Sequence, residues 1–147
     1  MPLNDLDRVE AVLTRESAAW DAGNAGAFAA DAQEGVLFTN LVGMFSIGRV
    51  PFIAQHEHIF STIYKGSRME QEVVAITLVR PDVAIVDTLT KLVDAPHRPP
   101  GVELIDGALR SRLEQVMVKD GTEWKVASFH NVAVNPAFAN GAPPPRS

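Results

Sequence analysis

Residues 108–134 read ALRSRLEQVMVKDGTEWKVASFHNVAV, and this stretch decides the class of the fold. Apolar residues alternate with polar ones through 108–119 and again through 123–134, and a period of two is typical of strands. The Asp120-Gly121 pair between the two runs favours a tight hairpin turn. We therefore expect two long antiparallel strands joined by a hairpin.

Two more strands are expected just upstream, at 68–80 and 83–94, with Pro81-Asp82 as the compact turn that joins them. The segment 95–107 is rich in Pro and Gly and is the longest connection between strands. Loops of this length are usually functional or mobile. The four strands are expected to pair with their sequence neighbours as an antiparallel meander.

Helical periodicity marks the N-terminal half. Through 5–22 apolar residues recur at three- and four-residue spacing, and Asn4 or Asp5 is placed to cap the helix start. A short second helix is expected over 24–31. A third follows Pro51, where one helical face would carry Phe52, His56, Ile59, Phe60 and Ile63.

A strand at 34–42 and its hairpin return at 44–47 separate the second helix from the third. Val36 and Phe38 share one face of that strand with Asn40. Helices first and a meander of long strands last predict an α+β fold.

The composition fits one globular domain, because the chain has 147 residues and a formal net charge of −5. No cluster of Lys and Arg is present, so a nucleic-acid partner is not expected. No apolar run approaches the roughly 20 residues of a membrane span, and the acidic N-terminus lacks the features of a secretory signal. We expect a cytoplasmic protein with no membrane partner.

One domain is expected over 1–135. The tail 136–147 ends GAPPPRS and has little apolar surface to bury, so we expect it to be disordered. The chain has no Cys, which excludes disulfides, thiolate metal sites and cysteine nucleophiles.

Three stretches carry a resemblance to a known superfamily: 19–24 (AWDAGN), 48–67, which ends YKGS, and 124–131 (WKVASFHN). Together with the order of elements, these stretches resemble the nuclear transport factor 2-like superfamily, which includes SnoaL-like proteins and ketosteroid isomerases. Within that superfamily they resemble the SgcJ/EcaC subfamily. The likeness covers roughly residues 6–134. It implies a cone, in which a strongly bent, mostly antiparallel sheet and three helices from the N-terminal half enclose one pocket, often in a homodimer.

His130 is the first candidate catalytic residue. On the last strand it alternates with Trp124, Val126 and Ser128, so we expect it to point into the cone with the core pair Trp124 and Val126. A neutral imidazole there can act as a general acid or base. The alternative is a histidine that only hydrogen-bonds within the core.

Asn40 stands where the resemblance to ketosteroid isomerases implies a catalytic Asp followed by Pro-Val-Gly; this chain has Asn40-Leu41-Val42-Gly43. An amide has no basic site, so the departure counts against steroid-isomerase chemistry. Asn40 is left as a residue that positions water or substrate, or as a polar residue that ends a strand.

Asp87 is a third candidate, as a carboxylate in the pocket if its face of strand 83–94 is concave. The opposite face is an equally good inner face, and it carries Ala84, Val86, Thr88 and Leu92. The pocket wall is expected to contain six aromatic or imidazole side chains: Trp20, Phe38, His56, Phe60, Tyr64 and Trp124.

The alternative for His56 is a structural role, as a boundary residue that packs on Phe60. The nearby His58 lies roughly 200° away around the helix, so the two histidines cannot share a metal. No metal-ligand spacing, Gly-rich phosphate loop or nucleophile elbow is present, so neither a metal nor a cofactor is expected.

Two functions fit these observations. The first is a cofactor-independent enzyme (isomerase, cyclase, hydrolase or lyase) that acts on a small apolar or polyketide-like molecule, with His130, Asn40 and Asp87 as its catalytic residues. The second is a non-catalytic binding protein or accessory dimer module. A homodimer through the outer face of the sheet is expected, because that face would carry Val116, Val118, Ala127 and Phe129.

Overall fold

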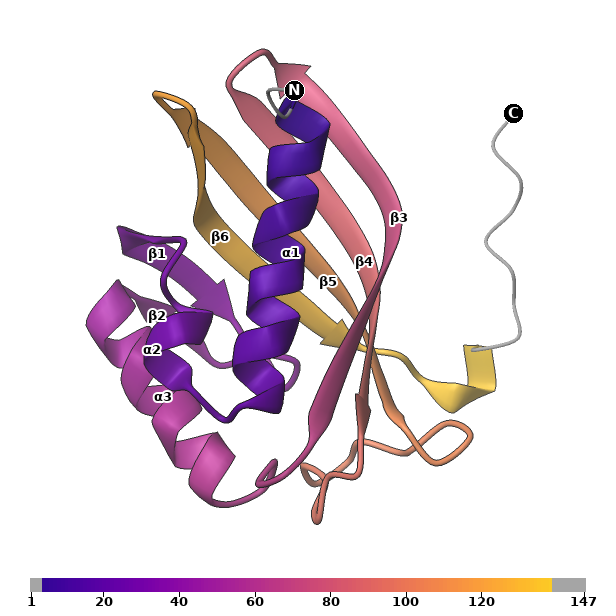
Figure 1. The fold of residues 1–147 in the computed structure, drawn as a ribbon. Coiled ribbons are helices and arrows are strands. Elements are labelled where there is room, and N and C mark those ends of the chain that lie inside the picture. The colour runs from indigo at the N-terminus through magenta and orange to yellow at the C-terminus, as the bar shows by residue number, and fades with distance from the viewer. Residues whose placement is uncertain (1–3, 139–147) are drawn as a thin grey trace.

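The computed structural model of the protein describes residues 4–138. Within that range the chain forms three α-helices and six strands in the predicted order (Figure 1). The helices are α1 (Asp5–Asp21), α2 (Ala25–Phe28) and α3 (Arg49–Ser61). The strands are β1 (Ala32–Thr39), β2 (Phe45–Ile47), β3 (Arg68–Arg80), β4 (Val83–Val93), β5 (Leu109–Asp120) and β6 (Glu123–Ala133).

The tail expected to be disordered begins with a single 3-10 turn, Pro136–Phe138. The rest of that tail, 139–147, lies outside the described residues.

One curved mixed sheet contains all six strands, in the order β2-β1-β6-β5-β4-β3. Strands β3 to β6 pair as the antiparallel meander that the sequence predicts. Strand β1 runs parallel to β6, so the β1-β2 hairpin extends the meander on the β6 side. Figure 1 shows the sheet bending around α1, with α2 and α3 beside the β1-β2 hairpin. The predicted α+β fold with a bent, mostly antiparallel sheet is confirmed.

Helix α1 covers the concave face of the sheet. Its start is fixed by Asn4, whose Oδ1 accepts the backbone N–H of Asp7 at 2.8 Å. Its inward face buries six side chains: Val9, Val12, Leu13, Glu16, Ala19 and Trp20. Five of them are apolar, and Glu16 is a carboxyl enclosed with them in the core.

A β-bulge in β6 decides which side chains of that strand face inward. Opposite neighbouring residues of β5, Val126 pairs with Met117 and Ser128 pairs with Val116, so Ala127 is the extra residue. Before the bulge Trp124 and Val126 are buried, and after it the buried side chain is Phe129. The alternation of this strand therefore changes phase at Ala127.

Candidate functional site

A cavity of about 240 Å³ lies between the concave face of the sheet, the C-terminal end of α1, and α3. Its wall is mostly apolar, and pockets for drug-sized ligands are usually larger, roughly 300–1,000 Å³. Among the described residues, no Asp, Glu, Lys or Arg lines it. Its lining side chains include Trp20, Phe28, Phe38, Asn40, Gln55, His56, Tyr64, Thr90, Ser111, Phe129 and Asn131.

His56 is the one histidine that lines the cavity, and its side chain is 3% exposed. Its Nδ1 lies 2.7 Å from the carbonyl oxygen of Phe52. Because a carbonyl only accepts, Nδ1 carries the hydrogen and Nε2 is left with a free lone pair. Burial lowers the pKa of the imidazole from 6.5 to about 4, so His56 is neutral near pH 7.

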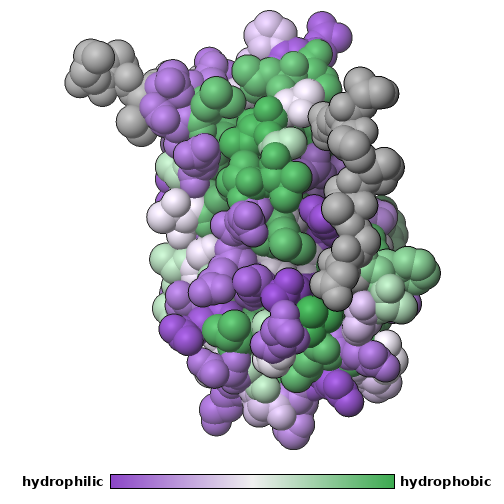
Figure 2. Space-filling view, turned by 90° about the vertical axis from the view of Figure 1, so that its right-hand side faces the viewer, coloured by the Kyte–Doolittle hydropathy of each residue, from purple (hydrophilic) through white to green (hydrophobic). Residues whose placement is uncertain are grey.

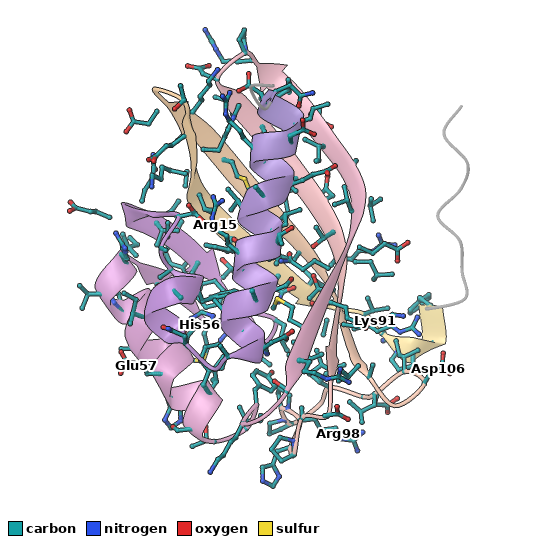
Figure 3. All side chains as sticks on the ribbon, in the orientation of Figure 1. Arg15, His56, Glu57, Lys91, Arg98 and Asp106 are labelled. Carbon is teal, nitrogen blue, oxygen red and sulfur yellow. The ribbon has the colours of Figure 1, made fainter. Side chains whose placement is uncertain are left out.

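Aromatic rings enclose His56 on several sides. The ring centroids of Phe52, Phe28 and Phe38 lie 4.3, 4.9 and 5.3 Å from that of His56. Trp20 meets it edge-on at 6.1 Å. In Figure 3, His56 lies on the inward side of α3, whereas Glu57 projects away from the molecule. The imidazole is therefore a polar group set in a hydrocarbon wall.

Hydroxyl groups supply part of the remaining polarity of the wall, together with the amides of Asn40, Gln55 and Asn131. Tyr64 is buried, and burial raises the pKa of its phenol to about 12, so it stays protonated. The Thr90 hydroxyl is 3.0 Å from that of Thr88, which also donates to the carbonyl of Leu113. Ser111 is buried beside Thr90 at the same level of the sheet.

Asn40 lines the cavity mouth as the residue that follows β1. Its side-chain Oδ1 accepts the backbone N–H groups of Val42 and Met44, at 3.1 and 2.8 Å. The amide oxygen therefore holds the turn between β1 and β2, which leaves only its NH₂ group for a ligand.

The prediction that His130 points into the cone is wrong. The side chain is exposed on the outer face, where it pairs with Glu114 across β5 and β6. The Ala127 bulge is the reason, because it shifts the alternation by one residue, so that Phe129 and Asn131 face inward. His130 is not part of the cavity and no catalytic role is assigned to it.

Asp87 also lies on the outer face, so the prediction that it enters the pocket is wrong. The fully buried face of β4 carries Ala84, Val86 and Thr88. Asp87 pairs instead with Glu114, whose pKa is raised, first by partial burial and then by the neighbouring Asp87 carboxylate. This outer row of Asp87, Glu114 and His130 is separated from the cavity by the sheet itself.

Two of the six expected wall residues are absent from the cavity. Trp124 is buried near the start of α1, where its Nε1 donates to Asp5 at 3.2 Å. Phe60 packs edge-on against Trp20, with ring centroids 4.8 Å apart, and supports the wall from behind. The structure places the other four, Trp20, Phe38, His56 and Tyr64, around the cavity, and their binding of a ligand stays a prediction.

The sequence matches no protein-family model and no curated protein. Solved structures do match. An uncharacterised protein with a cystatin-like fold from Caulobacter vibrioides is 26% identical, with a TM-score of 0.71 over 94% of this chain and 95% of that one. An NTF-2 like protein of unknown function from Shewanella oneidensis is 14% identical, with a TM-score of 0.71 over 88% and 99%. A ketosteroid isomerase-like protein from Erwinia carotovora is 17% identical, with a TM-score of 0.69 over 91% and 100%.

The chain has the nuclear transport factor 2-like fold. In this version of that fold, the sequence patterns missed four polar wall residues, which are Gln55, Thr90, Ser111 and Asn131. Ser111 alternates with Leu109 and Leu113, so the period of β5 contained the signal. Asn131 had no such signal, because its place depends on the bulge.

The loop between β4 and β5 closes one side of the nuclear transport factor 2-like cone. Pro99 and Pro100 line the cavity, and the backbone N–H of His97 donates to the carbonyl of Ile63 at 3.3 Å. The Pro-rich segment expected to be functional or mobile therefore contacts the candidate site.

Within residues 4–138, no group of three or more His, Cys, Asp or Glu side chains is arranged to hold a metal ion. In the same residues, no helix combines the length and the apolar character of a membrane span.

Proposed function

We propose that this protein binds a small, neutral, largely apolar molecule in the cavity of its cone. The observation that carries the proposal is a wall of aromatic and aliphatic side chains without any charged residue among those described. An ionic ligand would lose its hydration there and gain no counter-charge, which is strongly unfavourable. Uncharged groups such as Tyr64 and neutral His56 match an uncharged ligand.

The test is calorimetric titration of the full chain with propylbenzene and 4-propylphenol. Ser111 faces the cavity and Arg112 faces outward on the same strand, so this pair supplies matched variants. We expect saturable binding by the wild type and by Arg112→Leu, and loss of binding by Ser111→Leu, which fills the cavity. Absence of binding at millimolar probe, or equal binding by both variants, would overturn the proposal.

Catalysis without a cofactor is the second candidate, as an isomerase, cyclase, hydrolase or lyase. The observation that favours it is His56, which is unprotonated at neutral pH and has a free Nε2, the state that a general base requires. A base with a pKa of about 4 is weak, because the most effective bases have pKa values near the working pH. The cavity therefore supports ligand binding more strongly than catalysis.

Proton transfer by His56 is tested with a small ketone, 4-phenyl-2-butanone, in deuterated buffer. Magnetic resonance follows the exchange of hydrogens next to the carbonyl. Catalysed exchange by the wild type and by His130→Phe, but not by His56→Phe, would support an enzyme. Exchange at the uncatalysed rate in all three samples would leave a binding protein.

We also propose that a second copy of the chain covers the outer face of the sheet. Leu37 and Val132 are 40% and 53% exposed there, and Val116 and Val118 are partly buried on the same face. Phe129, which the sequence had placed on this face, is buried on the inner one. Figure 2, which faces the β3 edge, shows a further green area, and the exposed apolar side chains of that strand are Val73, Val74, Leu78 and Val79. Exposed apolar side chains gathered on one face often mark a protein–protein contact.

The finer assignment to the SgcJ/EcaC subfamily is also proposed, on the three sequence stretches at 19–24, 48–67 and 124–131.

A further inference from the structure

Several hydrogen-bonding groups of the cavity wall have partners within the protein. Trp20 donates its Nε1–H to the Ser67 hydroxyl at 2.9 Å, and that hydroxyl donates to the carbonyl of Tyr64 at 2.7 Å. The Asn40 oxygen is held by two backbone N–H groups. The Thr90 hydroxyl is paired with that of Thr88. None of these groups requires a ligand.

His56 is different. Its Nδ1–H is used by the Phe52 carbonyl, and no hydrogen bond to Nε2 is found within residues 4–138. The Nδ1 bond also fixes the ring orientation, because turning the ring over would break it. The surrounding rings of Phe28, Phe38 and Phe52 carry no donor that could reach the lone pair.

We propose that the ligand carries a hydroxyl or N–H group that donates a hydrogen bond to Nε2 of His56. This inference rests on the proposed function and names the class of molecule that the cavity selects: neutral alcohols, phenols or amines of low basicity, attached to an apolar body.

An acceptor with one lone pair discriminates sharply among ligands. A hydrocarbon of the same shape would cover Nε2 without pairing it, and a ketone or ether would set one acceptor against another. Burial keeps the imidazole neutral, so Nε2 stays an acceptor and does not donate a hydrogen bond to a carbonyl ligand. From the penalty of one unpaired buried group, we expect about a 10- to 100-fold preference for the donor-bearing molecule.

Three probes of similar shape test the inference by calorimetric titration at pH 7.5: 4-propylphenol, 4-propylanisole and propylbenzene. The phenol differs from propylbenzene by a hydroxyl and from the anisole by a methyl cap on that hydroxyl. Without the hydrogen bond, propylbenzene would bind at least as well as the phenol, because it is the more apolar. We expect the phenol to bind about 10- to 100-fold more tightly than either of the others.

The variant His56→Phe should remove this preference, and His130→Phe, on the outer face, should keep it. If His56→Phe fails to fold, the ¹⁵N resonance of Nε2 in the wild type replaces it. A shift of that resonance when the phenol binds, and none with the anisole, supports the inference.

Equal affinity for the three probes in the wild type, or a phenol preference that survives in folded His56→Phe, would overturn this inference and leave the proposed function standing. An Nε2 resonance that ignores the bound phenol would do the same. Failure of all three probes to bind would overturn the proposed function as well.

Discussion

The Nε2 of Gln115 donates to Oε1 of Glu16 across 2.8 Å, which joins two buried residues 99 positions apart in the chain. A second amide, Nε2 of Gln71, approaches the same oxygen at 3.3 Å. Three acceptor oxygens in this cluster have no partner within residues 4–138: Glu16 Oε2, Gln71 Oε1 and Gln115 Oε1. A proton on Glu16 adds one more donor to a cluster that has more acceptor oxygens than partners for them.

Burial raises the pKa of Glu16 from 4.5 to about 7, so the folded protein holds a proton that the unfolded chain releases above pH 4.5. The contribution of Glu16 to the unfolding free energy is therefore complete below pH 4.5 and is lost as the pH rises to about 7. The loss approaches about 3–4 kcal/mol, because the two pKa values differ by about 2.5 and a difference of one in pKa corresponds to about 1.4 kcal/mol.

His56 acts in the opposite direction. Its pKa falls from 6.5 to about 4 on folding, so its contribution is complete above pH 6.5 and is lost as the pH falls to about 4. In the window from about 4.5 to 6.5 the two groups nearly cancel. We expect urea denaturation to show a stability that rises with pH for Glu16→Gln and falls with pH for His56→Phe. Parallel pH profiles for these variants and the wild type would contradict the assignment.

Phe129 and His130 are neighbours with opposite expected effects. Phe129→Ala empties a buried site and should lower the unfolding free energy by about 3–5 kcal/mol. His130→Ala alters an exposed side chain and should change it by no more than about 0.5 kcal/mol. Urea denaturation of both variants checks the phase of β6. A larger loss for His130→Ala would mean that the bulge is misplaced.

Asn40 is expected to stabilise the β1-β2 turn through its acceptor oxygen rather than through its NH₂ group. Asn40→Ala leaves the N–H groups of Val42 and Met44 without that acceptor and should cost about 1 kcal/mol. Asn40→Asp keeps an acceptor in place and should cost less. Thermal unfolding at pH 7 compares them, and equal losses would argue against the turn role.

Ser67 is expected to matter through the indole of Trp20. Ser67→Ala leaves a buried N–H unpaired and should lower the unfolding free energy by about 1–3 kcal/mol. The matched control is Ser61→Ala, whose exposed hydroxyl donates to the carbonyl of His58. Similar small losses for both variants in urea would remove the special role of the Trp20 contact.

The proposed second copy on the outer face has a direct test in light scattering. A dimer mass is expected for the wild type. Val132→Asp places a charge on the exposed face and should yield the monomer, whereas Glu57→Asp, on the outward side of α3, should not. A monomer mass for the wild type would refute the proposal.

The main elements could be predicted because their signals are local. The strand 68–80 and the start of the strand at 123 agree with the structure to the residue, since turn dipeptides bound them. Asn4, one of the two expected caps of the first helix, accepts a backbone N–H through its side-chain oxygen, and Asn24 does the same at the start of α2. The expected second helix over 24–31 is shorter in the structure, because α2 ends at Phe28.

The candidate site could be predicted only in part, because it depends on contacts between distant residues. Either face of β4 was apolar enough to be the inner one, and burial in the folded sheet selects the face that carries Ala84, Val86 and Thr88. The burial of Glu16 had no local signal, since its partners Gln71 and Gln115 lie on β3 and β5. The Ala127 bulge has no sequence signature of its own, and it reversed the expected position of His130.

The extra residue at Ala127 shifts the inward and outward alternation of β6 by one position for every residue that follows it. Deletion of Ala127 would turn the Phe129 side chain outward and the His130 imidazole inward without changing any residue after the deletion. The loss of a single codon would thus replace an aromatic residue of the cavity wall with an ionisable one. The number of residues in β6 before a given side chain therefore decides whether that side chain faces the cavity or the outer surface.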